Sequence, residues 1–242
     1  MKKIYLDAGH GGNDVGAVGY VVEREVAVKV TNYMYDYLEA NYKCSLRKTK
    51  GTDNLNTRCK KANDWGADLF VSIHYNAGKG DGYEALVYDK DNLKLGQCFE
   101  KQVKAVGQNS RGAKYRPDLA VLRLTDCKAV LNEIAFVDNK KDIKDWDEPA
   151  ELKKMGIALA KAAAEWLKLP RKTSETHIVS KIRVGAKVKI KEGAKDLNTK
   201  KKYSAFVYKT TYEVISISGD RVVFGLKGAV TGATDKDNIK LI

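Results

Sequence analysis

Residues 68–77 have the sequence DLFVSIHYNA, which is strongly apolar. Their apolar run has the length of a buried strand and ends abruptly in polar side chains. Residues 2–10, KKIYLDAGH, have the same form and lead into a glycine-rich turn. Because buried strands of this kind are typical of parallel sheets covered by helices, the two segments predict an α/β domain.

Strand and helix patterns alternate along the rest of the first 170 residues. Apolar side chains recur at spacings of three and four in residues 23–42, which predicts an amphipathic helix. Asp53 is expected to cap a helix that reaches Trp65. Further strands are expected at CSLRKT, YEALVYD, AVLRL and KAVLNEIAF, and further helices over residues 92–106 and 148–169. This order predicts a layered, twisted and mostly parallel sheet flanked by helices, with sites beyond the carboxyl ends of the strands.

The pattern changes after Pro170, which ends the last of these helices. We expect a domain at residues 1–169, a polar linker at 170–181 and a second domain at 182–242. In the second domain, short runs rich in β-branched and aromatic residues are separated by turn signals: AKVKIK, SAFVYK, TYEVISI, DRVVFG and NIKLI. Such runs predict a small all-β domain, preferably a barrel.

The composition excludes several classes of protein. With 43% hydrophobic and 31% charged residues, the chain has the composition of a folded protein rather than a disordered one. No run approaches the ~18 apolar residues of a membrane span. The start, MKKIYLDAGHGG, has too few apolar residues for a signal peptide, so synthesis without export is expected. The cysteines lack metal-site spacing and are expected to be reduced core side chains: Cys44, Cys59, Cys98 and Cys127.

The net charge of +13 is unevenly distributed along the chain. Residues 171–242 hold 16 Lys and Arg against 7 Asp and Glu, a net charge of +9. This asymmetry suggests a polyanionic partner, although lysines that keep a small β domain soluble are the simpler alternative. Four aromatic side chains are available to stack on nucleic-acid bases, but their alternation favours core positions, so no nucleic acid is expected: Tyr203, Phe206, Tyr208 and Tyr212.

Two of the three histidines end predicted strands, His10 in DAGHGG and His74 in SIHYNA, whereas His177 lies in the polar linker and is given no role. Two histidines at neighbouring strand ends suggest a shared metal, and a catalytic zinc needs a third ligand and an open position. Glu23 and Glu25 at the start of the first helix can supply that ligand, or they can simply complement the helix dipole.

Glu133 lies inside the apolar strand VLNEIAF. Burial of a carboxylate is costly unless it is paired or faces a metal, and burial raises its pKa. Such a group suits general acid–base chemistry beside a metal. Exposure at a strand edge is the alternative interpretation.

Together these motifs resemble the zinc-dependent N-acetylmuramoyl-L-alanine amidases of bacterial cell-wall turnover and phage lysis, over nearly all of residues 1–168. DAGHGGNDVGAVG is similar to the first metal motif of that family, and EREV is similar to the start of its first helix. TDNLNTRCKKAN, SIHYNA and AVLNEIAFVDN are similar to the later motifs, in the same order. Ala8 stands where proline is common, and Ile-Ala follows Glu133 where Thr-Gly is usual.

The resemblance implies one zinc ion per chain, held by His10, Glu23 and His74, with Glu133 as the catalytic residue. It implies hydrolysis of the amide between N-acetylmuramic acid and L-alanine by a zinc-activated water. The alternatives are a zinc peptidase that cuts the stem peptide and a non-catalytic wall-binding protein. Arg58 and Asn76 are candidates for either a substrate contact or a structural role.

The second domain resembles the SH3-like wall-binding domains that follow phage amidases. This implies peptidoglycan and anionic wall polymers of Gram-positive bacteria as its partners. RGAKYRPDLAVLR is similar to the compact phage lysis enzymes, so the expectation is an endolysin that is made in the host cytoplasm and released by a phage lysis system. A host sporulation or autolytic amidase is the runner-up.

Overall fold

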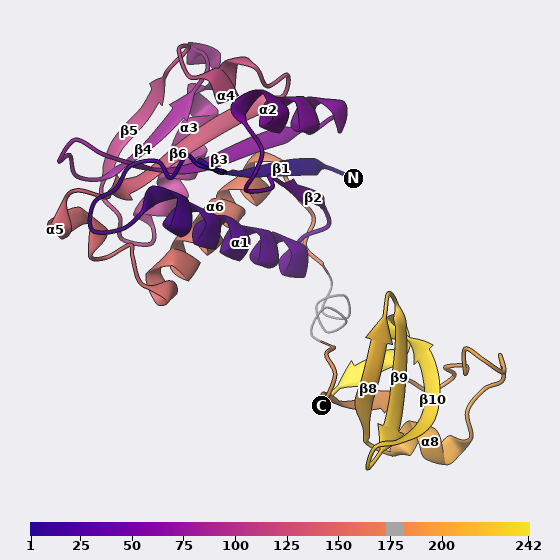
Figure 1. Ribbon diagram of the computed structural model, residues 1–242. Coiled ribbons are helices and arrows are strands. Elements are labelled where there is room, and N and C mark those ends of the chain that lie inside the picture. The colour runs from indigo at the N-terminus through magenta and orange to yellow at the C-terminus, as the bar shows by residue number, and fades with distance from the viewer. Residues whose placement is uncertain (173–181) are drawn as a thin grey trace. The chain divides into compact units, whose positions relative to one another are not determined.

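The computed structural model describes residues 1–172 and 182–242 (Figure 1). The chain divides into two compact units, Met1–Arg171 and Lys172–Ile242, each with a hydrophobic core of its own. The division falls inside the expected linker. His177 and most of that linker lie outside the described residues. No helix among the described residues is long and apolar enough to cross a membrane.

The first unit is built around a six-stranded sheet with the strand order β2-β1-β3-β6-β4-β5. All neighbouring strands are parallel except β4 and β6, so the predicted α/β class with a mostly parallel sheet is confirmed. The strands are β1 Lys3–Ala8, β2 Ser45–Lys48, β3 Leu69–Asn76, β4 Tyr83–Val87, β5 Ser110–Tyr115 and β6 Lys128–Phe136. The helices are α1 Glu23–Asn41, α2 Leu55–Asp64, 3-10 helix η1 Lys90–Asn92, α3 Leu93–Lys104, α4 Ala120–Arg123, α5 Lys140–Ile143 and α6 Pro149–Trp166.

Helices cover both faces of this sheet, with α1 and α6 on one side and α2 and α4 on the other (Figure 1). Side chains alternate between the faces along each strand. On β3, Leu69, Val71 and Ile73 belong to the core under α1, α3 and α6, whereas Phe70 packs with Tyr5 under α2 and α4. The strands therefore carry near-continuous apolar runs, as expected for a sheet buried on both faces.

The face under α2 and α4 changes from apolar to polar toward the carboxyl ends of β1, β3 and β6. Asp7 and Ser72 follow the apolar residues on this face, and His74 and Glu133 come after them. Glu133 is the register partner of His74 on β3 and of Glu84 on β4. The fold thus gathers a row of ionisable side chains at one end of one face, where α/β sheets carry their sites.

Two local predictions for the first unit are wrong, and one strand was missed. AVLRL is the short helix α4 rather than a strand, because Val121 and Leu122 both pack against the sheet. The adjacent strand β5 was not predicted. The N-cap of α2 is Asn54 rather than Asp53: the Asn54 side chain accepts a hydrogen bond from Thr57 N, while that of Asp53 binds Lys50 N and Lys61 Nζ.

The second unit has a five-stranded antiparallel sheet with the order β10-β9-β8-β7-β11. Its elements are β7 Lys187–Ile190, α8 Ala205–Lys209, β8 Tyr212–Ser218, β9 Arg221–Leu226, β10 Ala229–Asp235, 3-10 helix η2 Lys236–Asn238 and β11 Ile239–Leu241. SAFVYK was predicted to be a strand, which is wrong: it forms α8, with Val207 buried and Phe206 exposed. β10 was not predicted. Tyr212 and Phe224 meet edge to face in the core.

Candidate active site

Glu23 joins the two strand-end histidines. It is the first residue of α1 and is buried, and its Oε1 lies 2.9 Å from His10 Nε2 and 3.0 Å from His74 Nδ1. Backbone N–H groups hold the same carboxylate: Tyr75 donates to Oε1 and Ala17 donates to Oε2. One nitrogen of each imidazole and one oxygen of Glu23 lie within 4.8 Å of one another. Two imidazole nitrogens and one carboxylate oxygen are a ligand set that leaves a metal an open position.

The loop after β1 brings His10 to this cluster through a strained backbone and glycines. His10 has a φ of 64°, in the left-handed region that side chains other than glycine seldom adopt. A Cβ on Gly9 would lie 2.5 Å from His74 Cε1, and a Cβ on Gly16 would lie 2.5 Å from Glu23 Oε2. Glycine at both positions therefore lets the two imidazoles and the carboxylate meet.

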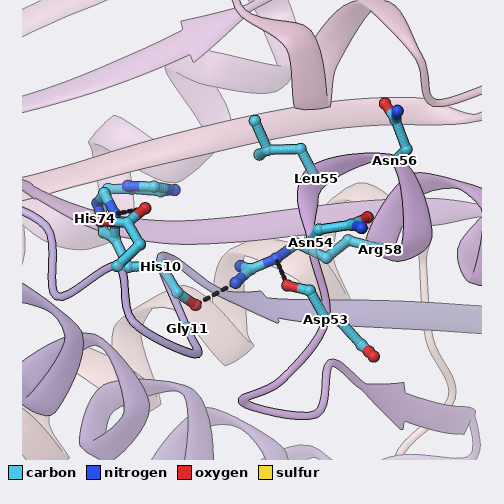
Figure 2. A pocket seen from close by; sticks show the side chains of 9 residues that line it. His10, Gly11, Asp53, Asn54, Leu55, Asn56, Arg58 and His74 are labelled. Atoms are coloured by element: carbon cyan, nitrogen blue, oxygen red, sulfur yellow. Dashed lines mark hydrogen bonds and ion pairs between the residues drawn. The ribbon is translucent and has the colours of Figure 1, made fainter.

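Arg58 fastens the same loop from α2 (Figure 2). Its buried guanidinium donates to the carbonyl oxygens of Ala8 and His10, and it lies 3.0 Å from the buried Asp7 carboxylate. Asp7 also accepts a hydrogen bond from Ser72 Oγ, at 2.6 Å. Arg58 thus has a structural role, one of the two roles that the sequence left open.

The charges around the cluster shift the pKa values of its members. The hydrogen bond to Glu23, and a second one to Asp14 Oδ2 at 2.8 Å, raise the pKa of His10 to about 9 despite burial. Burial alone would raise the pKa of Glu23, but its hydrogen bonds with His10 and His74 hold it well below the usual range. Because Asp14 binds Nδ1 of His10, it leaves Nε2 as the nitrogen that faces the cluster.

Glu133 lies beside the cluster as the register partner of His74. Its Oε2 atom is buried and has no hydrogen-bond partner among the described residues. Burial, together with the charges of Glu23 and Glu84, raises the pKa of this carboxyl from 4.5 to about 7, although His74 opposes the shift. Glu133 therefore lies on an inner strand of the sheet rather than at an exposed edge, and its side chain is only partly exposed. A carboxyl group with a pKa near neutrality can both accept and donate a proton.

A cavity of about 580 Å³ opens beside His10 and His74 (Figure 2). The loop before α2 and the first turn of that helix form its other wall. Its lining residues are His10, Gly11, Asp14, Asp53, Asn54, Leu55, Asn56, Arg58 and His74. The cavity therefore offers amide and carboxylate groups next to the three candidate ligands, which suits a polar substrate.

The structure thus brings together all four predicted site residues: His10, Glu23, His74 and Glu133. Glu25 is exposed and has no place in the cluster. The side chain of Asn76 binds Ala77 N, a local backbone contact.

Asp14 and Glu84 are parts of the site that sequence reasoning missed. Glu84 had the same signal as Glu133, an acidic residue inside an apolar strand, here YEALV. Asp14 lies in a glycine-rich loop, GGND, where no spacing distinguishes it from an ordinary turn residue.

Known proteins are similar to this chain in sequence and in fold. An endolysin of Bacillus phage SPP1 is 34% identical over 186 residues, which cover 71% of this chain and 68% of the relative. A sporulation-specific N-acetylmuramoyl-L-alanine amidase of Bacillus subtilis (strain 168) is 31% identical, over 81% of this chain and 79% of the relative.

A solved structure agrees with these relatives. The catalytic domain of CwlV, an N-acetylmuramoyl-L-alanine amidase from Bacillus (Paenibacillus) polymyxa var. colistinus, superposes with a TM-score of 0.66 at 27% identity and covers 70% of this chain and 100% of that domain. The family profile described as N-acetylmuramoyl-L-alanine amidase matches residues 4–165, which lie within the first unit. The chain therefore belongs to the N-acetylmuramoyl-L-alanine amidase family.

Proposed function

We propose that the protein is an endolysin that hydrolyses the amide bond between N-acetylmuramic acid and L-alanine in peptidoglycan, with one zinc ion held by His10, Glu23 and His74. The observation that carries this proposal is the meeting of these three donors beside Glu133, whose Oε2 is buried without a partner among the described residues. The membership of the chain in the amidase family supports the choice of bond.

The donor set fits zinc. Imidazole nitrogen and carboxylate oxygen are both zinc ligands, and only one of the three is anionic, so the ion keeps much of its positive charge. Asp14 would orient the His10 ring from outside, as carboxylates do for zinc-bound histidines. Zinc, when bound at such a site, lowers the pKa of water toward ~7 and polarises the substrate carbonyl.

Glu133 is proposed to transfer a proton from the attacking water to the leaving amine. Its carboxylate accepts a proton from the attacking water, whose oxygen adds to the lactyl carbonyl carbon. When the C–N bond breaks, the same carboxyl donates that proton to the departing amine of L-alanine. A pKa of about 7 suits both halves of this cycle, because the carboxyl is near the midpoint of its titration at neutral pH.

Digestion of purified Gram-positive peptidoglycan tests the reaction. New amino-terminal L-alanine without new reducing sugar ends is the expected product. Cleavage within the stem peptide would instead favour a zinc peptidase, and binding without cleavage would favour a non-catalytic wall protein.

The second unit is proposed to be an SH3-like domain that holds the enzyme on the anionic wall. Its five-stranded antiparallel sheet, its separate core and its excess of lysine support this role. Long-range attraction to wall polymers is screened beyond ~8 Å at physiological salt. Residues 172–242 should therefore sediment with isolated walls at low salt, and less so at high salt. Absence of binding at low salt would contradict this role.

Release by a phage lysis system is proposed because of the 34% identity with the phage endolysin. A host amidase is the second candidate, because the chain is also similar to the sporulation-specific amidase. Expression inside Bacillus cells distinguishes the two functions. An endolysin should lyse the cells only after the membrane is permeabilised, whereas an exported host amidase acts without permeabilisation.

A further inference from the structure

A pair of cations lies two strands away from Glu133. Glu84 on β4 is the register partner of Glu133, and its Oε1 binds Arg111 Nε and Lys114 Nζ, both from β5 and both at 2.5 Å. The carboxylate of Glu84 is nearly buried, whereas both cationic side chains are about two-fifths exposed.

Arg111 is held in place and still has free donors. Glu84 binds its Nε, and the ring of Phe136 lies 5.3 Å from its Cζ, at a distance typical of cation–π contacts. Within residues 1–172 and 182–242, its Nη1 and Nη2 groups have no hydrogen-bond partner. A guanidinium fixed on one side and exposed at its terminal nitrogens matches the fork geometry that binds a carboxylate through two hydrogen bonds.

The charge balance also favours an anion at this position. Two cations share one oxygen of one carboxylate, so the group of Glu84, Arg111 and Lys114 keeps one positive charge in excess. The second cation and the free guanidinium edge are therefore available for a ligand.

We propose that Arg111, assisted by Lys114, binds a free carboxylate of the stem peptide. When L-alanine is counted as the first residue after the scissile amide, this carboxylate belongs to the second or third residue. This inference rests on the proposed amidase function. Neighbouring strands lie about 4.8 Å apart, so β5 is roughly 10 Å from Glu133 on β6. An extended peptide advances about 3.4 Å per residue, so its second or third side chain arrives at that distance. The glycan would then lie toward the cavity beside α2.

The test uses two soluble muramoyl peptides that differ only at the second residue, which carries either a free carboxyl or a carboxamide. A second pair differs in the same way at the third residue. We expect the wild type to prefer the carboxylate form of one pair. Arg111→Gln should raise KM for that form about 10-fold to 100-fold and leave kcat nearly unchanged, because the contact is remote from the reacting atoms. On the carboxamide form the variant should lose less than on the carboxylate form.

Arg47→Gln is the matched control, since Arg47 lies on the opposite edge strand β2 and also stacks on an aromatic ring, that of Trp65. Arg47→Gln should change KM for neither the carboxylate form nor the carboxamide form. Arg111→Lys keeps the charge but loses the fork, and we expect an intermediate KM. Zinc content and thermal unfolding report whether each variant is folded, and Lys114→Gln gives a second, smaller loss if Arg111→Gln does not fold.

Two outcomes overturn the inference while leaving the amidase function intact. One is equal use of the carboxylate and carboxamide forms by the wild type in both pairs. The other is an equal loss on both forms in Arg111→Gln, which would mean that Arg111 only supports Glu84. Failure of the wild type to cleave any of the four substrates would instead contradict the amidase function and this inference with it.

Discussion

His74 and Glu133 are register partners on the parallel strands β3 and β6, and both project on the face that α2 and α4 cover. One is a candidate metal ligand and the other a carboxyl group whose pKa is raised to about 7. Neighbouring positions on adjacent strands fix the two side chains relative to each other, without the freedom of a loop. The sheet therefore places His74 and Glu133, whereas His10 reaches the cluster on the loop after β1.

Glu133→Gln should abolish amide hydrolysis while keeping the fold and the zinc. The amide is nearly isosteric with the carboxyl group but cannot accept the proton of water, so a loss of about 10²-fold to 10⁴-fold is expected. Chromatography of soluble muramoyl-peptide digests and elemental analysis of the same samples measure both properties. A variant that cleaves at the parent rate would remove Glu133 from the mechanism.

The free energy of unfolding of the metal-free protein should fall as the pH rises, because Glu133 becomes charged. The pKa of this carboxyl is 4.5 in an ordinary setting and about 7 in the folded protein. The folded state thus binds the proton more tightly than the unfolded state, so the cost of ionisation is absent below pH 4.5, grows between pH 4.5 and 7, and is constant above. Between pH 5 and pH 8, wild type should lose about 2 kcal/mol in unfolding free energy relative to Glu133→Gln.

Urea titrations with a chelator present measure this difference at the two pH values. Glu25→Gln is the control, because Glu25 is an exposed carboxylate on α1. A constant difference between wild type and Glu133→Gln from pH 5 to pH 8 would contradict burial as the cause of the raised pKa.

Glu23 and Glu25 should differ sharply in their contribution to zinc binding. The carboxylate of Glu23 lies between His10 and His74, whereas Glu25 is exposed. Glu23→Gln should therefore lose stoichiometric zinc, and Glu25→Gln should keep it. Elemental analysis after gel filtration measures both. Equal zinc content in the two variants would exclude Glu23 as a ligand.

Arg58→Lys should weaken zinc binding, although Arg58 is not itself a candidate zinc ligand. An ammonium group cannot bind Asp7 and the carbonyl oxygens of Ala8 and His10 at once, as the guanidinium does. We expect zinc affinity to fall about 10-fold to 100-fold, the usual cost of losing an outer-shell contact. Competition with a chromophoric chelator measures the affinity.

Arg24→Lys is the control, because Arg24 donates to Gly12 O in the same loop from a more exposed position. Similar zinc affinities in the two variants would contradict the role of Arg58.

Much of the first unit could be predicted because its strands are long apolar runs and its helices have clear periodicity. The histidines and Glu133 stood out because each interrupts or ends such a run. Short elements gave less information: the four residues of α4 cannot display a helical period, and β5, an edge strand with the sequence SRGAKY, has little apolar character. In the second unit, β10 was missed because AVTGATD contains alanine and glycine, which are uncommon in strands.

The tertiary arrangement of the site could not be predicted from the sequence. The antiparallel β4 enters the sheet between β6 and β5, and only this order places Glu84 beside Glu133 and brings Arg111 to Glu84. Likewise, nothing in the spacing of Arg58 predicts that it fastens a loop some 50 residues earlier, as its bonds to Ala8 and His10 do.

Mass spectrometry of the fragments that zinc-loaded protein releases from purified Gram-positive peptidoglycan identifies the bond that is cut. We expect free stem peptides that begin with L-alanine and glycan strands whose lactyl groups end in a carboxylic acid, with neither product formed by Glu133→Gln or after zinc is removed. Fragments cut within the stem peptide or the glycan, or the same amide products from the zinc-free protein, would contradict the proposed function.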